Sequence, residues 1–452
     1  MPATSITEDL QKEELEDDIS QVEVKKTDDS VDINKLAALK AKIQAKQENN
    51  MLVSNMKKDR SLEIGVLGSG QAGSRIAEAM FKLGYNAIAC NTAIQDLKFI
   101  NIPDSNKLLL NNGIGGSSKE ISIGAAAAEM HRQEILDLVN DKLSTSQVNM
   151  LCLSLGGGSG AGSCETIVSV LEEVGKPIVV MAVLPMDSDD VKSKANSLET
   201  LSKLSDMTKN KRIANLICVD NAKIESIYSH VGQMDFYNIA NDAIVEPLDV
   251  FNVFSSQPSS VKALDGMELV KLLIGGEGLS TYGHFNVENF TDDTAVAEAV
   301  INNLSNNLLA SHFNLKQSRF AGFLLIANKE VWAQIPSSSI NYSVSVVNDL
   351  CGNPEGVFKG LYVDNSTENV VKVYSWFAGL GMPIERLDQL KNETKELQLK
   401  VKAKDDARNL TLQLDTGKNE AVSAAQKVKD KIAQKSSTFG KFISTSVVDR
   451  RK

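Results

Sequence analysis

Two glycine-rich stretches of the sequence have residue types suited to binding phosphate. Residues 68–73 read GSGQAG and residues 156–163 read GGGSGAGS, and each stretch follows an apolar run. Backbone N–H groups at the start of a helix bind phosphate without a charged side chain, and glycine lets the backbone approach the ligand closely. Neither stretch fits the lysine-containing P-loop pattern GxxxxGK[ST]. We therefore expect both loops to hold phosphate through the backbone, with the hydroxyls of Ser159 and Ser163 adding contacts.

A third glycine turn, NGIGGSS at residues 112–118, also precedes a predicted helix. Three such turns in one sheet favour a nucleotide phosphate site over three structural turns without a ligand. The residues that we predict to contact the phosphates are Gly68, Ser69, Gly70, Gln71, Ala72, Gly115, Gly116, Ser117, Gly156, Gly157, Gly158, Ser159, Gly160, Ala161, Gly162 and Ser163.

The first glycine stretch, taken alone, has two other interpretations. It fits the GxGxxG pattern of dinucleotide-binding enzymes, and it is also typical of a tight turn that binds nothing. A dinucleotide site needs an acid at the end of the second strand to bind the ribose. The sequence there reads CNTA, so Asn91 and Thr92 stand in that place. A Rossmann-type NAD-dependent oxidoreductase therefore stays open as an alternative that the second glycine loop disfavours.

Three further residues have the chemistry to bind a base. Asn221 ends a predicted strand, and Tyr237 and Asn241 lie four residues apart, so they are neighbours on one helix face. An aromatic ring can stack on a purine, while amides can pair with both the carbonyl and the amine of guanine. Each residue alone is more often used for packing or capping, but their joint spacing favours base binding.

The elements that must position these residues alternate between strand and helix from residue 61 onward. The apolar runs at residues 148–155 and 178–185 are typical of buried parallel strands. Parallel strands covered by helices form an α/β fold, in which the carboxyl ends of the strands share one edge and ligands bind there. A second, smaller α/β unit is expected after residue 257, and a charged helix from residue 383.

Composition narrows the function classes. The chain has 452 residues, a formal net charge of −10 and 42% hydrophobic residues, which predicts two or three globular domains. Its acidity argues against direct nucleic-acid binding by the core. Five cysteines without a CxxC pair predict buried thiols in a reducing cytoplasm, not a metal cluster. No apolar run approaches 18 residues, so we expect no membrane association.

Together these stretches resemble the tubulin/FtsZ superfamily of GTPases. GSGQAGS, CNTA and NGIGGSSKE resemble its first three nucleotide loops, and LGGGSGAGS matches its signature GGG[ST]G[TAS]G[ST]. VDNAKI and the Tyr237–Asn241 pair resemble the residues that bind guanine there. The resemblance covers residues 61–385. It implies GTP and GDP as ligands with Mg²⁺, and a Rossmann-like parallel-sheet domain, a central helix, a smaller α/β domain and a long C-terminal helix.

Two stretches are similar to the plasmid- and phage-encoded TubZ branch of the superfamily. They are VLPMDSD, which contains Asp187, and KVYSWFAGLGMP. This likeness implies that Asp187 contacts the nucleotide. It also implies a role in the segregation or positioning of plasmid or phage DNA.

Two positions depart from the superfamily pattern. Ala93 stands where FtsZ has an aspartate, so Mg²⁺ would be held by Asp96 through water or mostly by the phosphates. The loop ALDGME at residues 263–268 lacks the usual asparagine but keeps Asp265 and Glu268. By resemblance, these two acids are catalytic and complete the active site of the next subunit in a head-to-tail filament. A helix cap made by these acids and a non-hydrolysing structural homologue remain alternatives.

The organisation that follows has five parts. They are a polar acidic, partly disordered extension (1–60), a GTP-binding domain (61–235), a central helix (236–256), a GTPase-activating domain (257–385) and a C-terminal helix with a basic tail (386–452). The expected partners are other copies of this chain and a DNA-bound adaptor that contacts the basic tail, unless that tail is only solvated. The expected location is the cytoplasm.

Overall fold

The structure is a computed structural model that describes residues 59–113, 115–229 and 231–412. Two predictions lie outside the described residues. They are the partly disordered extension, of which only residues 59 and 60 are described, and the basic tail.

One ten-stranded sheet organises the described chain, in the order β3-β2-β1-β4-β5-β6-β7-β10-β8-β9. The strands are β1 (Ile64–Ser69), β2 (Asn86–Asn91), β3 (Lys107–Leu109), β4 (Val148–Ser154), β5 (Ile178–Leu184), β6 (Asn215–Asp220), β7 (Gly278–Val287), β8 (Phe320–Ala327), β9 (Gly356–Val363) and β10 (Val371–Leu380). The strands from β3 to β7 in this order are parallel, whereas β10 runs antiparallel to β7 and β8. The two predicted α/β parts therefore share one sheet, joined by the short β6–β7 pairing.

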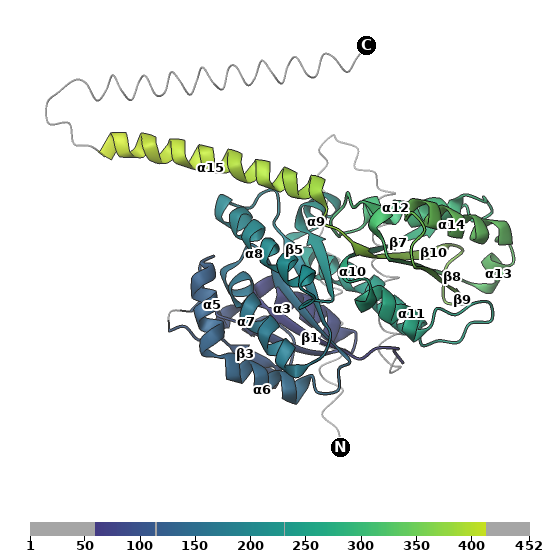
Figure 1. The fold of residues 1–452 in the computed structure, drawn as a ribbon, viewed down its shortest axis with the longest axis horizontal. Coiled ribbons are helices and arrows are strands. Elements are labelled where there is room, and N and C mark those ends of the chain that lie inside the picture. The colour runs from purple at the N-terminus through teal and green to yellow at the C-terminus, as the bar shows by residue number, and fades with distance from the viewer. Residues whose placement is uncertain (1–58, 114, 230, 413–452) are drawn as a thin grey trace, which may run out of the picture. The chain divides into compact units, whose positions relative to one another are not determined.

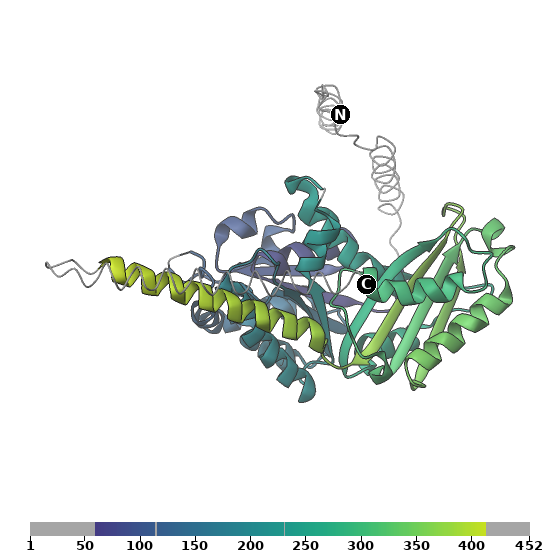
Figure 2. The ribbon, with the colours of Figure 1, turned by 90° about the horizontal axis from the view of Figure 1, so that it is seen from above.

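Helices cover both faces of this sheet (Figures 1 and 2). Before the central helix they are α3 (Gly70–Lys82), α4 (Ile94–Lys98), α5 (Ile121–Met130), α6 (Arg132–Lys142), α7 (Gly158–Val174), α8 (Val191–Lys209) and α9 (Asn221–Ile227). The central helix is α10 (Gln233–Phe254), followed by α11 (Gly266–Val270), α12 (Ala295–Asn306), α13 (Lys329–Trp332), α14 (Ser337–Leu350) and α15 (Ile384–Leu412). Among the described helices, none combines the length and the apolar character needed to span a membrane.

The core explains why the parallel strands read as continuous apolar runs. Side chains alternate between the two faces of a strand, and both faces are covered here. In β4, Leu151 and Leu153 belong to one buried cluster, while Met150 and Cys152 belong to a second cluster on the other face. All five cysteines are buried and free, as predicted, and burial raises the pKa of Cys90 to about 12.

The structure differs from the sequence pattern at three places. The period and propensity of residues 119–143 predict a single helix, but the structure divides it into α5 and α6 at His131, whose ring contacts Glu134 and the carbonyl of Asn111. Strand β7 was not predicted. Pro247 predicts a kink or an early end of the helix, and the early end is wrong, because α10 continues to Phe254. The Tyr282 hydroxyl donates to the Ile244 carbonyl in the turn before the proline and ties this part of α10 to β7.

Candidate nucleotide-binding site

The first and last glycine loops meet at the carboxyl edge of the sheet. Strands β1 and β4 are neighbours, and Ser69 pairs with Leu153 just before each loop begins. Gly70 has a φ of +72°, and a Cβ atom on it would lie 2.9 Å from the Gly160 nitrogen. Only glycine fits here, because a side chain would be both strained and too close to the backbone of the second loop.

Hydroxyl groups join all four predicted loops into one surface. Ser69 Oγ is hydrogen-bonded to Ser163 Oγ at 2.6 Å, which links the first loop to the last. Ser159 Oγ is hydrogen-bonded to Thr92 Oγ1 at 2.6 Å and to Ser117 Oγ at 3.0 Å. The structure therefore brings together the residues that the sequence singled out after β1, β2, β3 and β4.

The glycines of these loops divide into two groups. A Cβ atom on Gly68, Gly73 or Gly162 would overlap neighbouring backbone atoms. Gly68 and Gly73 therefore allow α3 to pack closely on the strands, and Gly162 allows α7 to pack closely on α5. By contrast, a Cβ atom on Gly115 would meet nothing within 4 Å, and one on Gly157 would come no nearer than 3.8 Å to Ser154 Oγ. The open positions are the ones whose backbone can approach a ligand.

The helices that begin at these loops leave their first N–H groups without a side-chain cap. Ser69 and Gly157 are the N-cap residues of α3 and α7, and neither makes a side-chain capping bond. The first N–H groups of a helix have no partner within the helix, and the helix dipole favours an anion there. Two such ends beside one another suit the phosphates of one nucleotide.

The predicted base-binding residues lie on α9 and α10. Asn221 is the first residue of α9, and the preceding Asp220 caps that helix through the Ala222 nitrogen. Tyr237 lies in the first turns of α10, where its ring packs edge-on against Phe236 at 5.1 Å. Asn241 follows one turn later and is half-buried. The start of α10 lies beside the first glycine loop, because α10 packs against α3 and Arg75 of α3 lies over the Tyr237 ring.

Asp187 is exposed in the loop between β5 and α8. Its carbonyl accepts a hydrogen bond from Lys194 Nζ at 3.0 Å, and the same ammonium pairs with Glu393 of α15 at 2.8 Å. The Lys194 side chain is only 3% exposed. Sequence reasoning missed Lys194, because an isolated lysine within a helix is usually solvated.

Asp96 is the carboxylate nearest in sequence to the second loop. Its Oδ2 atom accepts from Asn91 Nδ2 at 2.9 Å, and Asn91 Oδ1 accepts from the Ala93 nitrogen. Mg²⁺ is typically bound by one or two carboxylates together with substrate phosphates, so this donor set fits the ion. The described residues contain no group of three or more His, Cys, Asp or Glu side chains suited to a metal.

Asp265 and Glu268 form the capping arrangement that the sequence left open as an alternative. The Glu268 nitrogen donates to Asp265 Oδ1 at 2.8 Å, and the Asp265 nitrogen donates to Glu268 Oε2 at 3.1 Å. These two bonds form a capping box at the start of α11. The remaining carboxylate oxygens, Asp265 Oδ2 and Glu268 Oε1, take no part in it.

These two acids lie at the opposite edge of the sheet from the glycine loops. A Cβ atom on Gly266, between them, would lie 3.2 Å from Ser61 Cβ, and Ser61 precedes β1. The end of α10 is fixed there too, because the Ser61 nitrogen donates to the Asn252 carbonyl. The first glycine loop begins where β1 ends, roughly 25 Å away at 3.3 Å per strand residue. The acids therefore cannot reach a nucleotide in their own subunit.

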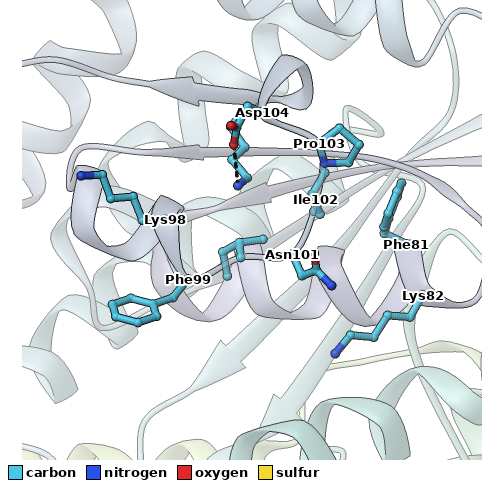
Figure 3. Close-up of a pocket in the computed structure, with 10 residues that line it drawn as sticks. Phe81, Lys82, Lys98, Phe99, Asn101, Ile102, Pro103 and Asp104 are labelled. Atoms are coloured by element: carbon cyan, nitrogen blue, oxygen red, sulfur yellow. Dashed lines mark hydrogen bonds and ion pairs between the residues drawn. The ribbon is translucent and has the colours of Figure 1, made fainter. Parts of the chain in front are cut away.

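A pocket of about 730 Å³ lies apart from the glycine loops (Figure 3). It is lined by the end of α3, the segment after α4 and the start of β3, and Phe99 beside it is 83% exposed. None of the predicted nucleotide-binding residues lines this pocket. We assign it no part in nucleotide binding.

Comparison with known proteins identifies the family. Residues 63–229 match the GTPase domain of the tubulin/FtsZ family. The tubulin-like protein CetZ of Pyrococcus furiosus is 24% identical over 326 residues, covering 70% of this chain and 84% of CetZ. TubZ of Bacillus thuringiensis subsp. israelensis is 24% identical over 388 residues, covering 75% of this chain and 78% of TubZ.

A solved structure shares the fold. The GTPγS-form protofilament of TubZ from Bacillus thuringiensis serovar israelensis superposes with a TM-score of 0.69 at 20% identity, covering 79% of this chain and 97% of that one. The expected architecture of sheet, central helix and C-terminal helix is thus confirmed. The match of residues 63–229 to a GTPase domain excludes the alternative of an NAD-dependent oxidoreductase. The chain thus contains, at residues 63–229, a GTPase domain of the tubulin/FtsZ family.

Proposed function

We propose that this protein binds and hydrolyses GTP while it assembles head-to-tail into filaments. The observation that carries the proposal is the separation of two incomplete half-sites. The glycine loops offer phosphate-binding backbone but no side chain that can position water, and Asp265 and Glu268 lie at the opposite edge of the sheet. Stacking copies in one direction brings the acids of one subunit to the loops of the next.

Backbone and side-chain groups of this chain bind both the phosphates and the base of GTP. The uncapped N-termini of α3 and α7 and the open backbone of Gly115 and Gly157 face the phosphates, while Tyr237 stacks on the base. Asn221 and Asn241 pair with the guanine edge. When bound, Mg²⁺ neutralises phosphate charge, and Asp96 would hold it directly or through water.

Catalysis requires a group that orients the attacking water. The exposed Asp265 and half-buried Glu268 each keep one carboxylate oxygen outside the capping box, and these oxygens would accept hydrogen bonds from that water. The capping box fixes both side chains, so it preorganises them for the neighbouring subunit. A structural role and a catalytic role are compatible here.

The relatives support assembly and leave the cellular role open. The TubZ structure is a protofilament, but CetZ and TubZ are equally identical to this chain, at 24%. We propose the segregation or positioning of plasmid or phage DNA because of the TubZ-like stretch that contains Asp187. An adaptor that binds the basic tail remains a prediction.

The test is phosphate release from GTP as a function of protein concentration. Asp265→Asn keeps a good N-cap residue while removing the charge, so α11 should keep its stability. We expect wild-type release above a critical concentration only, and at least about a hundredfold slower release by Asp265→Asn filaments, within the usual range for a group that positions water. Wild-type release by this variant would refute the role of Asp265.

One alternative has specific support. The capping box gives both acids a structural reason to be present, and Ala93 replaces the usual acid of the second loop. Under this alternative the chain binds GTP and polymerises without hydrolysis. Wild-type filaments that assemble with GTP and release no phosphate would favour it.

A further inference from the structure

Arg75 is a cation at the edge of the nucleotide site to which the proposed function gives no role. It lies in the second turn of α3, directly after the first glycine loop. Its guanidinium lies over the ring of Tyr237, with Cζ 4.9 Å from the ring centroid. A cation over an aromatic face is a favourable contact, but it uses none of the five N–H donors.

Five other arginines between residues 59 and 386 form ion pairs, unlike Arg75. Arg60, Arg132, Arg212, Arg319 and Arg386 each pair with a carboxylate. Arg75 has no ion pair or hydrogen bond to any residue that the structure describes, and its contact is the Tyr237 ring. A half-buried guanidinium with all its donors free, beside a ring suited to stacking on a base, points to a ligand rich in acceptors.

We propose that Arg75 binds the O6 and N7 atoms of guanine and so makes the site selective for guanine over adenine. This inference rests on the proposed function, because it places guanine on Tyr237. Guanine presents two adjacent acceptors, O6 and N7, whereas adenine presents the N7 acceptor beside an amine donor. The planar guanidinium donates to both guanine atoms at once, and lysine cannot reproduce that geometry.

The position of Arg75 suits this role. A base that stacks on the covered face of Tyr237 takes the place of the guanidinium and moves it to the edge of the base, where its N–H groups point at O6 and N7. Asn221 and Asn241 then accept hydrogen bonds from the N1–H and N2 donors on the other edge of guanine. Arg75 and the two asparagines thus contact different edges of the base.

The test is calorimetric titration of the full chain with GDP, 7-deaza-GDP and ADP. Diphosphates avoid turnover, and the deaza analogue lacks only the N7 acceptor. For wild type we expect GDP to bind roughly tenfold more tightly than 7-deaza-GDP, the usual effect of one charge-assisted hydrogen bond. For Arg75→Met we expect weaker GDP binding, no distinction between GDP and 7-deaza-GDP, and a smaller preference for GDP over ADP. Arg75→Lys should recover only part of the loss.

Lys82→Met, at the far end of the same helix, is the matched control and should keep the wild-type ratios. Equal binding of GDP and 7-deaza-GDP by the wild type would overturn the inference and leave the proposed function intact. So would an Arg75→Met variant that loses affinity for both ligands equally, because that result places Arg75 on the phosphates or in the fold. If the wild type binds no guanine nucleotide, the proposed function fails, and this inference fails with it.

Discussion

At the residue scale, the glycines of the first and last loops have two different roles. Gly162 and Gly68 allow close packing against neighbouring backbone, whereas Gly157 has an ordinary φ of −81° and open space around its missing Cβ. The sequence predicted the loops and their ligand class because glycine runs at strand ends have few other uses. It could not separate packing glycines from ligand-facing ones, since that depends on which neighbour lies behind each Cβ. The sequence could not show that Arg75 lacks an ion pair either, because that also depends on its neighbours in the fold.

Because a side chain at Gly157 would have room, a substitution there can block phosphate binding without disturbing the packing of the loop. Gly157→Asp adds a favourable N-cap to α7 but puts a negative charge beside the phosphates. We expect the variant to fold with an unchanged or raised melting temperature and to bind GDP at least about a hundredfold more weakly, as charge repulsion in a partly buried site implies. The isosteric Gly157→Asn should bind clearly better than Gly157→Asp. Equal GDP affinity of the two variants, measured by calorimetry, would mean that the phosphates lie elsewhere.

At the element scale, α15 is fixed to the end of β6, just before α9. Arg386 in its first turn donates from Nε to Asp220 Oδ2 at 2.8 Å and from Nη2 to Asp220 Oδ1 at 3.0 Å. Both side chains are buried, and Asp220 also caps α9, which begins with Asn221. Burial opposes the charge on Arg386, yet the bonds to Asp220 raise its pKa overall. The start of α15 thus holds the segment that presents Asn221.

This ion pair predicts a large effect on stability. Arg386→Met leaves the Asp220 carboxylate buried without a partner, which typically costs about 3–5 kcal/mol. Lys391→Met removes an exposed pair with Asp388 on the same helix and should change little. The double variant Arg386→Met/Asp220→Asn should recover much of the loss. Thermal unfolding of the four proteins checks this, and similar melting temperatures for Arg386→Met and Lys391→Met would contradict it.

The elements that sequence predicted well are those with one dominant pattern. The apolar runs of β4 and β5 and the charged α15 are examples. Strand β7 carries Gly283, His284 and Asn286, and its final half is largely exposed, so neither alternation nor an apolar run marks it. The break at His131 depends on a contact with Asn111, which is distant in sequence. Pro247 predicts a kink or an early end, but α10 continues past it to Phe254, within a helix whose side chains pack in the core.

At the scale of the whole molecule, the sheet separates the glycine loops from the two acids at α11. Strand β1 leads from Ser61, beside α11, to the first glycine loop, so the two half-sites lie at opposite ends of one rigid element. The central helix α10 spans the same distance, with Tyr237 near its start and Asn252 fixed beside Ser61 near its end. Under the proposed function, such a subunit presents its acids at one end and its nucleotide at the other. The proposed active site then forms only where two copies meet.

Mixing two inactive variants tests this claim most directly. Gly157→Asp lacks a usable phosphate site but keeps its acids, and Asp265→Asn binds GTP but lacks the acid. Each variant alone should release almost no phosphate. In an equimolar mixture, GTP on the Asp265→Asn subunits meets intact acids of the Gly157→Asp subunits, so release should rise well above the sum of the separate rates. A mixture that releases no more than that sum, under conditions where the wild type hydrolyses GTP, would contradict an active site completed between subunits.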